Sequence, residues 1–451
     1  MALFGTDGAR GVANRELTVE MALTIGKAAG ARWGPEARVL VARDTRISSG
    51  MLEAGVAAGL TALGVDVWMT GMLPTPALAH LIKATAADGG VMISASHNPP
   101  RYNGIKLLDG LGRKWPPEQE QAVETGMEKA ARLSVEPEQI GQIRHLEDDA
   151  VVRYRRFLVQ SFWDRIDPLY VVVDLAHGAA ISTAVPVLEA LGVKVGAIHA
   201  EPWGERINQA CGATHPEALQ QAVRERKADL GLAFDGDADR LIAVDQHGQI
   251  VDGDAVLYLL ACGMKLRGEL TNGRVVATVM SNLGLERALA KQGIPLTRTP
   301  VGDRWVAERL QETGAVLGGE QSGHIILKQW SETGDGLLTA LAVMAEMQSR
   351  QRGLAELTSP LERYPQVLHN VRLKTPIDDW NRLTRLKQRV AEAERDLGAE
   401  GRVLIRPSGT EPLLRVMVEG RDSQRIQKWV KLLVQSVEEE LGALGIGTPT
   451  G

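Results

Sequence analysis

The chain has 451 residues, 44% of them hydrophobic and 24% charged, which is typical of a globular protein with about three or four domains. Its 51 lysines and arginines and 56 aspartates and glutamates give a net charge of -5, so a nucleic-acid partner, which usually requires a basic excess, is not expected. The two cysteines, Cys211 and Cys262, fit no metal spacing, which favours a reducing cytoplasm. The first residues carry no secretory signal and no apolar run reaches the ~20 residues of a membrane helix, so no membrane association is expected.

Three stretches of the chain resemble one another. Each begins with a β-branched run that predicts a strand, at residues 39–42, 170–173 and 274–277. A helical pattern and a second short strand follow, and a further apolar strand then runs into a polar loop. A parallel crossover needs a helix, so we expect parallel sheets with ligands beyond the carboxyl ends of their strands. The repeat therefore predicts three α/β domains, residues 1–150, 151–250 and 251–363, whose loops serve one cleft.

The first loop, residues 94–99, reads Ser-Ala-Ser-His-Asn-Pro. Ser96 is a candidate nucleophile, but a serine needs a base or a metal to react. His97 does not form a triad merely by being adjacent, because neighbouring side chains on extended backbone diverge. Two cations of the same domain, Arg10 and Lys106, could neutralise a transferring phosphoryl group or could be solvated surface charges. A serine-rich turn without function remains the alternative for this loop.

The second loop places Asp235, Asp237 and Asp239 at alternating positions, so in an extended loop all three carboxylates can face one point. Three such charges repel unless a cation neutralises them, and oxygen ligands favour Mg²⁺, Mn²⁺ or Ca²⁺. An EF-hand does not fit, because Arg240 replaces its glycine and Gln246 its final glutamate. A Mg²⁺ site beside a serine is suited to phosphoryl transfer. A solvated acidic turn is the alternative.

The third loop, residues 319–324, carries Glu320 and Ser322, which could hydrogen-bond sugar hydroxyls. His324 could serve as an acid, a base or a phosphate contact. A purely structural capping role is the alternative for these residues.

The last part of the chain, residues 364–451, predicts a small α+β domain with two helices flanking two strands. Between the strands lies the segment 406–412. Arg406 offers a bidentate fork for phosphate, and Ser408, Thr410 and the backbone around Gly409 could complete an anion nest. A surface turn is the alternative.

Taken together, these motifs resemble those of the α-D-phosphohexomutase superfamily over essentially the whole chain. The family's phosphoserine, metal, sugar and phosphate loops look, in order, like residues 94–99, 235–240, 319–324 and 406–412. Five segments look like the branch that acts on glucosamine phosphates: residues 4–8, 277–284, 299–304, 319–326 and 415–419. Ala9, His177 and residues 100–102 depart from that branch, which puts substrate fine-tuning in doubt more than the reaction.

The resemblance implies three similar mixed α/β domains and a C-terminal α+β domain, arranged in a heart shape around a central cleft. It implies an isomerase that interconverts glucosamine 6-phosphate and glucosamine 1-phosphate for amino-sugar nucleotide and cell-wall precursor synthesis. A phosphoserine at Ser96 would give its phosphoryl group to the sugar phosphate and take the other phosphate back from a bisphosphate intermediate. Glucosamine 1,6-bisphosphate, or a related hexose bisphosphate, would serve as primer.

The same resemblance implies roles for individual residues. Mg²⁺ would bind Asp235, Asp237, Asp239 and the phosphate of Ser96. Four residues would lie near the transferring group, with Lys106 favoured for proton transfer: Arg10, His97, Lys106 and His324. Eight would contact the phosphoserine or the substrate: Arg240, Glu320, Ser322, Arg406, Ser408, Gly409, Thr410 and Arg415. The expected partner is a small sugar phosphate, and a homodimer is one option for the assembly.

Three other functions fit the motifs less closely. The main rival is a phosphoglucomutase or phosphomannomutase of the same superfamily. A metal-dependent sugar phosphatase would use Ser96 as nucleophile but would release phosphate steadily and need no primer. A catalytically inactive sugar-phosphate sensor is disfavoured, because it would not need to keep Ser96, the three aspartates and Arg406.

Overall fold

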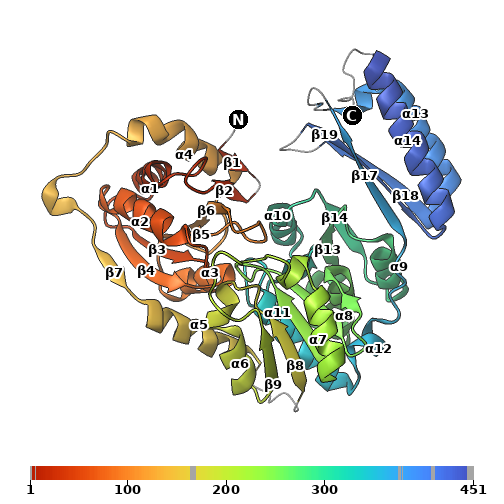
Figure 1. The fold of residues 1–451 in the computed structure, drawn as a ribbon, viewed down its shortest axis with the longest axis horizontal. Coiled ribbons are helices and arrows are strands. Elements are labelled where there is room, and N and C mark those ends of the chain that lie inside the picture. Colours follow the sequence, from red (N-terminus) through yellow and green to blue (C-terminus); the bar gives the residue numbers. More distant parts are fainter. Residues whose placement is uncertain are drawn as a thin grey trace. The chain divides into compact units, whose positions relative to one another are not determined.

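The computed structural model describes residues 3–5, 7–162, 169–373, 377, 379–407 and 412–443. The chain divides into two compact units. Unit 1 comprises Met1–Met280 and Gln292–Pro360, and unit 2 comprises Ser281–Lys291 and Leu361–Gly451. Within the described residues, unit 1 contains three β-sheets and unit 2 one (Figure 1).

The first sheet of unit 1 has the strand order β1-β2-β6-β5-β3-β4-β7. Strands β5, β3, β4 and β7 are parallel, whereas β6 and β2 run antiparallel to their neighbours. The strands are β1 (Phe4–Gly5), β2 (Gly8–Val12), β3 (Arg38–Arg43), β4 (Asp66–Met72), β5 (Gly89–Ile93), β6 (Tyr102–Asp109) and β7 (Ile143–His145). The associated helices are α1 (Val19–Trp33), α2 (Ser49–Thr61), α3 (Thr75–Ala84), α4 (Pro117–Ala130) and α5 (Glu147–Ser161). Thr18 caps α1 by accepting the N–H of Met21.

The second sheet has the order β12-β11-β10-β8-β9 and the third the order β14-β13-β15-β16. The strands of the second are β8 (Tyr170–Asp174), β9 (Lys194–Ile198), β10 (Leu230–Phe234), β11 (Leu241–Asp245) and β12 (Ile250–Val251). Those of the third are β13 (Val275–Thr278), β14 (Leu296–Thr299), β15 (Leu317–Gly319) and β16 (Ile325–Leu327). Their helices in unit 1 are α6 (Ala184–Ala190), α7 (Glu217–Arg226), α8 (Gly253–Leu266), α10 (Asp303–Thr313), α11 (Gly336–Arg350) and α12 (Leu354–Thr358).

The three sheets share one pattern, which confirms the predicted repeat. In each, a buried strand parallel to the first strand of the copy ends in the polar loop, and the chain then returns antiparallel: β5 to β6, β10 to β11 and β15 to β16. The sheets are therefore mixed, as expected for three mixed α/β domains: the strands of the repeat are parallel and the return strands are antiparallel. The polar loops lie at the carboxyl ends of β5, β10 and β15, where an α/β sheet places its ligands.

Unit 2 contains an antiparallel sheet of order β17-β19-β18, with β17 (Gln366–Arg372), β18 (Gly401–Pro407) and β19 (Leu413–Gly420). Helices α13 (Thr384–Leu397) and α14 (Ser423–Ala443) pack on it through buried residues that include Leu386 and Leu433. Helix α9 (Leu283–Lys291) joins this unit, because the N–H of Leu283 donates to Glu419 Oε1 at 2.6 Å. The sequence predicts the two helices and β18 and β19 but not β17.

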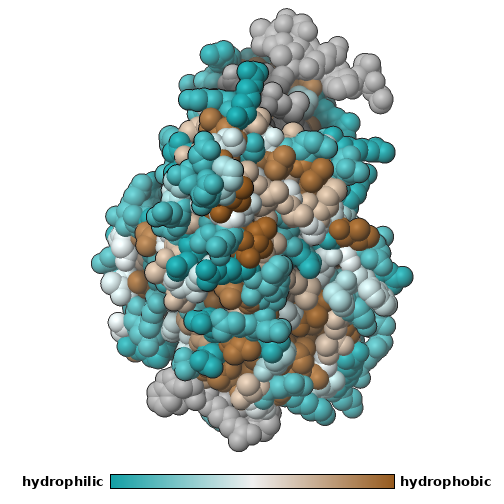
Figure 2. Space-filling view, turned by 90° about the vertical axis from the view of Figure 1, so that its left-hand side faces the viewer, coloured by the Kyte–Doolittle hydropathy of each residue, from teal (hydrophilic) through white to brown (hydrophobic). Residues whose placement is uncertain are grey.

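The molecular surface is mixed in character. On the face shown in Figure 2, hydrophobic areas are broken up by hydrophilic residues. Among the described helices, none is both long enough and apolar enough to cross a membrane.

Candidate active site

Ser96 lies in the turn that follows β5 and is 1% exposed. Its hydroxyl donates to Asp235 Oδ2 at 2.6 Å, which brings the serine loop and the acidic loop together as predicted. Ser96 has a φ of +50°, in the left-handed region that is strained for a side-chain-bearing residue. Such strain is held only where surrounding contacts fix it, which is common at functional sites.

Contacts with the backbone of the serine loop supply that constraint. Arg46 has a side chain that is fully buried and uses all five of its N–H groups. Nε donates to Asp44, and the two terminal nitrogens donate to four carbonyl oxygens, those of Ser96, Asn98, Pro99 and Tyr102. The loop is therefore clamped from one side by a single guanidinium.

A second group of contacts fixes the loop from the acidic side. Asn208 Nδ2 donates to the carbonyl oxygens of Ser96 and Asn98, at 2.8 and 3.2 Å. Gly236 lies so close that a Cβ there would stand 2.6 Å from Ser96 O. Ser94 accepts the N–H of Ser96 at 2.9 Å and donates to Asp44 at 2.7 Å, so Ser94 is committed to structure.

The acidic loop brings its three carboxylates together. One oxygen from each of Asp235, Asp237 and Asp239 lies within 4.8 Å of the others, and all three residues are buried. The loop is a turn, not the extended segment expected from the sequence: Ala238 N donates to Asp235 O, and Ala238 has a φ of +56°. The turn bends the chain so that the carboxylates converge.

Charge repulsion within this loop is only partly relieved by protein groups. Burial, with the charges of Asp239 and Asp237, raises the pKa of Asp235 well above its ordinary value, and burial and Asp237 also raise the pKa of Asp239. Asp237 Oδ1 and Asp239 Oδ1 are buried without a hydrogen-bond partner among the described residues. Carboxylate oxygens that lack hydrogen-bond partners are suitable ligands for a hard divalent cation such as Mg²⁺.

Lys106 lies on β6, is 1% exposed, and faces the acidic loop. Its Nζ is 2.8 Å from Asp237 Oδ2 and 3.3 Å from Asp7 Oδ2. Burial lowers the pKa of this ammonium, but Asp237 and Asp7 outweigh burial and raise it well above its ordinary value. Lys106 is therefore a fixed positive charge in this environment. A role for it in proton transfer stays a prediction, and its ion pairs favour charge neutralisation instead.

Asp7 links Lys106 to two further cations of unit 1. Arg10 and Lys114 both pair with its carboxylate, and Lys114 also pairs with Asp303. Despite burial, Lys106, Lys114 and Arg10 hold the pKa of Asp7 well below its ordinary value. The result is a partly buried network of alternating charge that reaches the acidic loop through Lys106.

The two predicted histidines have different surroundings. Burial, with the nearby Arg240 and Arg10, lowers the pKa of His97 to about 3, so its ring is neutral near neutral pH, and its Nδ1 lies 3.4 Å from Ser96 Oγ. His324 Nε2 accepts the N–H of Gly334 at 3.2 Å. A neutral His324 ring therefore carries its proton on Nδ1, which is buried without a partner in the described structure.

Arg240 and the sugar loop complete the candidate residues of unit 1. The N–H of Arg240 donates to Asp235 Oδ1 at 3.3 Å. The backbone of Arg240 also forms an isolated antiparallel β-bridge with the backbone of His324. Burial lowers the pKa of Arg240, but the charges of Asp235 and Asp239 outweigh burial and raise it above its ordinary value. Glu320 Oε1 accepts the N–H of Gly302 at 3.1 Å, and Ser322 is exposed.

In unit 2, Arg406 on β18 and Arg415 on β19 lie directly opposite each other. Like charges in this arrangement are destabilising. Burial and the neighbouring Arg415 lower the pKa of Arg406. Within the described residues, Nε of each arginine is buried without a hydrogen-bond partner, so the pair can accept an anion. The predicted contacts Ser408, Gly409 and Thr410 lie outside the described residues.

Comparison with known proteins identifies the family. Models of the four phosphoglucomutase/phosphomannomutase domains, I to III (alpha/beta/alpha) and the C-terminal domain, match residues 1–133, 152–248, 252–364 and 368–436. The phosphoglucosamine mutase of Caldanaerobacter subterraneus subsp. tengcongensis is 48% identical over 97% of this chain and 99% of its own. That of Saccharopolyspora erythraea is 49% identical over 96% of this chain and 98% of its own. The chain belongs to the phosphoglucosamine mutases.

Solved structures agree with the membership of this mutase family. A phosphoglucomutase/phosphomannomutase family protein from Burkholderia thailandensis is 26% identical and superposes with a TM-score of 0.82, covering 99% of this chain and 98% of its own. An N-acetylphosphoglucosamine mutase from Aspergillus fumigatus, solved with GlcNAc-6P and magnesium, shares the fold with a TM-score of 0.67 at 17% identity, over 97% of this chain and 96% of its own. The domain boundaries at residues 150, 250 and 363 stay predictions.

Several residues that position the site of this mutase were missed from the sequence. Asp44 and Arg46 hold the serine loop, Asp7 and Lys114 extend the charge network, and Asn208 supports the loop from the second sheet. Their partners are mostly carbonyl oxygens or residues far away in the chain. Only Asp7 stood within a motif that the sequence singled out, the segment 4–8.

Proposed function

We propose that this chain interconverts glucosamine 6-phosphate and glucosamine 1-phosphate through a phosphorylated Ser96. One observation carries the proposal: the buried Ser96 hydroxyl lies 2.6 Å from Asp235, in a cluster of carboxylates and fixed cations. This arrangement is suited to phosphoryl transfer, which depends on positioning and charge neutralisation more than on covalent machinery.

The carboxylates of Asp235, Asp237 and Asp239 are proposed to hold Mg²⁺ together with the phosphate of Ser96. When bound, the ion supplies positive charge to the phosphoryl oxygens. The unpartnered oxygens of Asp237 and Asp239 support this assignment.

The residues of unit 1 then have separate tasks in the transfer. The bond between phosphorus and Ser96 Oγ breaks as a bond to a sugar hydroxyl oxygen forms, and the proton that the hydroxyl loses is balanced by the proton that Ser96 Oγ gains as the free serine is restored. Arg10, Lys106 and Arg240 balance the charge of the moving phosphoryl group. His324 Nδ1 is proposed to donate a hydrogen bond to the same group.

The arginine pair of unit 2 is proposed to hold the phosphate that does not react. Arg406 and Arg415 present adjacent guanidinium groups whose repulsion an anion would relieve. The bisphosphate must be held in either orientation, so this binding energy should contribute to both half-reactions. Glu320 and Ser322 are proposed to contact ring hydroxyls.

The decisive test is the position of the phosphate. Incubation with glucosamine 1,6-bisphosphate, followed by intact-mass measurement, should show one added phosphoryl group on the wild type and none on Ser96→Ala. Ser94→Ala is the matched control and should retain the group, because Ser94 only supports the loop backbone. Labelling that survives in Ser96→Ala would overturn the assignment.

Substrate preference is tested by comparing rates on glucosamine, glucose and mannose 6-phosphates. One charge-assisted contact to the amino group is worth about 1.5–3 kcal/mol, so a preference of about ten- to a hundredfold is expected. Equal rates would instead support the phosphoglucomutase or phosphomannomutase alternative. Steady release of inorganic phosphate without primer would support the phosphatase.

Three further statements remain part of the proposal: a cytoplasmic location, a hexose bisphosphate primer and a homodimer as one option for the assembly. Size-exclusion chromatography with light scattering tests the last of these.

A further inference from the structure

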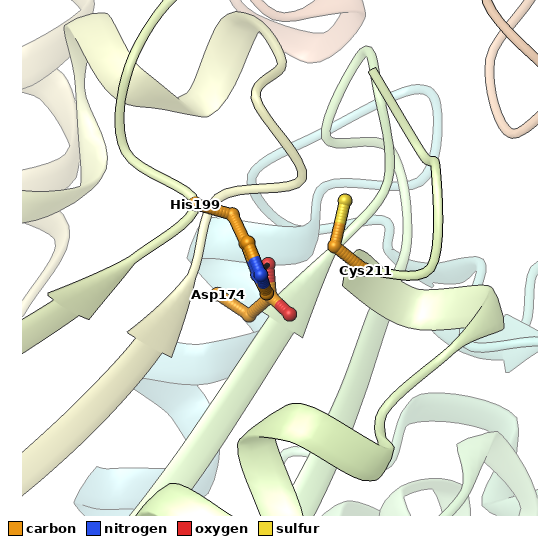
Figure 3. Close-up of side chains that lie close together, drawn as sticks. All are labelled: Asp174, His199 and Cys211. Carbon is orange, nitrogen blue, oxygen red and sulfur yellow. Dashed lines mark ion pairs between the residues drawn. The ribbon is translucent and has the colours of Figure 1, made fainter. Parts of the chain in front are cut away.

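A second cluster of ligand-type side chains lies in unit 1 and contains none of the residues assigned above (Figure 3). Asp174 ends β8, His199 directly follows β9, and Cys211 precedes the short turn Gly212–Thr214. One ligand atom of each lies within 4.8 Å of the other two. Asp174 and Cys211 are buried and His199 is 28% exposed, so the cluster lies just beneath the surface and is reached past the histidine.

The chemistry of these donors differs from that of the acidic loop. A thiolate, an imidazole and a carboxylate match Zn²⁺ and similar ions, whereas Mg²⁺ is bound by oxygen. Three protein ligands leave a fourth, tetrahedral position for water. Among the described residues, this cluster and the acidic loop should therefore select different ions.

The geometry is close to that of a tetrahedral site. Ligand atoms bound to one Zn²⁺ stand about 3.3–3.5 Å apart, given Zn–N and Zn–O distances of about 2.0 Å and Zn–S of about 2.3 Å. His199 Nδ1 lies 3.0 Å from Asp174 Oδ1, which is close to the spacing of two ligands on one ion. The Cys211 sulfur lies within 4.8 Å of the other two ligand atoms, so a tetrahedral site requires it to move closer by up to about 1.3 Å, through rotation of the Cys211 side chain.

Backbone contacts hold two of the ligands in place. Asp174 Oδ1 accepts the N–H of Ala176 at 3.0 Å, and Oδ2 accepts the N–H of Gly212 at 2.9 Å. Because Gly212 follows Cys211 directly, the same contact fixes the backbone of Cys211 beside the carboxylate. Hydrogen bonds of this kind orient the ligands of metal sites.

The thiol is protonated in the absence of a cation. Burial and the charge of Asp174 raise the pKa of Cys211 to about 12. Formation of the metal–sulfur bond therefore releases one proton to solvent, and apparent affinity should increase with pH.

We propose that Asp174, His199 and Cys211 bind a divalent ion that accepts sulfur and nitrogen ligands, with Zn²⁺ as the best match. The ion joins β8 to the segment 199–212. That segment includes Asn208, whose amide holds the carbonyl oxygens of Ser96 and Asn98. The ion thus steadies the serine loop from outside the reaction centre.

Co²⁺ provides a direct probe, because a cobalt–thiolate bond gives a near-ultraviolet charge-transfer band that oxygen ligands do not. The chelator-treated enzyme is titrated with Co²⁺ in excess Mg²⁺, which occupies the acidic loop. One Co²⁺ per chain should produce the band, and Zn²⁺ should remove it by displacement. Cys262→Ser, at the other cysteine, is the matched control and should keep the band, whereas Cys211→Ser should lose it.

His199→Gln is the second variant, because a change at this partly exposed residue is less disruptive to folding. It should weaken Co²⁺ binding by at least about tenfold. Zn²⁺ should also slow amide hydrogen exchange in residues 199–212 of the wild type but not of His199→Gln. Absence of the band in the wild type, or a band that Cys262→Ser removes, would overturn the proposal.

Discussion

Arg46 in unit 1 and Arg406 in unit 2 are both at least partly buried. They differ in whether their N–H groups have hydrogen-bond acceptors. Arg46 has an acceptor for each of its five N–H groups, among them four carbonyl oxygens of the serine loop and its exit. Arg406 faces a second arginine and has a buried Nε without a partner in the described structure. A satisfied buried cation indicates structure, whereas an unsatisfied one indicates a ligand.

The largest effect on stability is expected from substitution of Arg46. Arg46→Met should destabilise unit 1 by about 3–5 kcal/mol, because it leaves Asp44 charged, buried and without its main partner. Urea unfolding of the purified enzyme measures the change. Lysine cannot replace the five N–H groups, so Arg46→Lys should recover only part of the loss. Wild-type stability in Arg46→Met would contradict the assignment of Arg46 to structure.

Arg406 should show the opposite behaviour. Arg406→Ala should raise the substrate concentration required for half-maximal rate by about ten- to a hundredfold, the value of a charge-assisted contact of about 1.5–3 kcal/mol. Its unfolding free energy should change by less than about 1 kcal/mol, because removal of one of two opposed cations relieves repulsion. Steady-state kinetics and urea unfolding separate the two effects. Unchanged apparent affinity would count decisively against a phosphate site on these strands.

The two arginines also show what a sequence can and cannot reveal. Arg406 stands in a segment with serine, threonine and glycine, a composition that indicates anion binding. Arg46 was missed because its partners are carbonyl oxygens, which every residue has and which leave no trace in the sequence. Cys211 was likewise set aside on spacing, although two neighbouring strands bring Asp174 and His199 to it. Local patterns revealed the repeat, the loops and the meeting of the serine and acidic loops, but not the side chains that hold the loop backbone in place.

The same distinction between satisfied and unsatisfied buried groups applies to the carboxylates of the acidic loop. There it predicts that stability depends on pH. The pKa of Asp235 and of Asp239 is raised, so their protonation favours the folded state. This contribution is complete below their ordinary pKa of about 4 and is lost as pH rises through the raised values. Mg²⁺ binds the ionised form, so its stabilising effect should grow over the same range.

Thermal unfolding with Mg²⁺ or with chelator, from mildly acidic to mildly alkaline buffers, measures that growth. Asp235→Asn should flatten the pH dependence of the metal-free protein and reduce the response to Mg²⁺. A Mg²⁺ response that is equal at all pH values would exclude the three carboxylates as its source.

The smallest expected effect concerns backbone strain in the acidic loop, which does not depend on the charges of the loop. Ala238 has a φ of +56°, where a Cβ is unfavourable and glycine is not. Ala238→Gly should therefore stabilise the protein by about 0.5–1 kcal/mol, after the greater chain entropy of glycine is allowed for. Ala95→Gly is the matched control, since Ala95 is buried in the serine loop without a positive φ, and it should destabilise. Activity should be retained in Ala238→Gly, because the substitution removes only a methyl group and leaves every polar side chain in place. If Ala238→Gly destabilised as much as Ala95→Gly, strain in the acidic loop would have to be abandoned as an explanation of its shape.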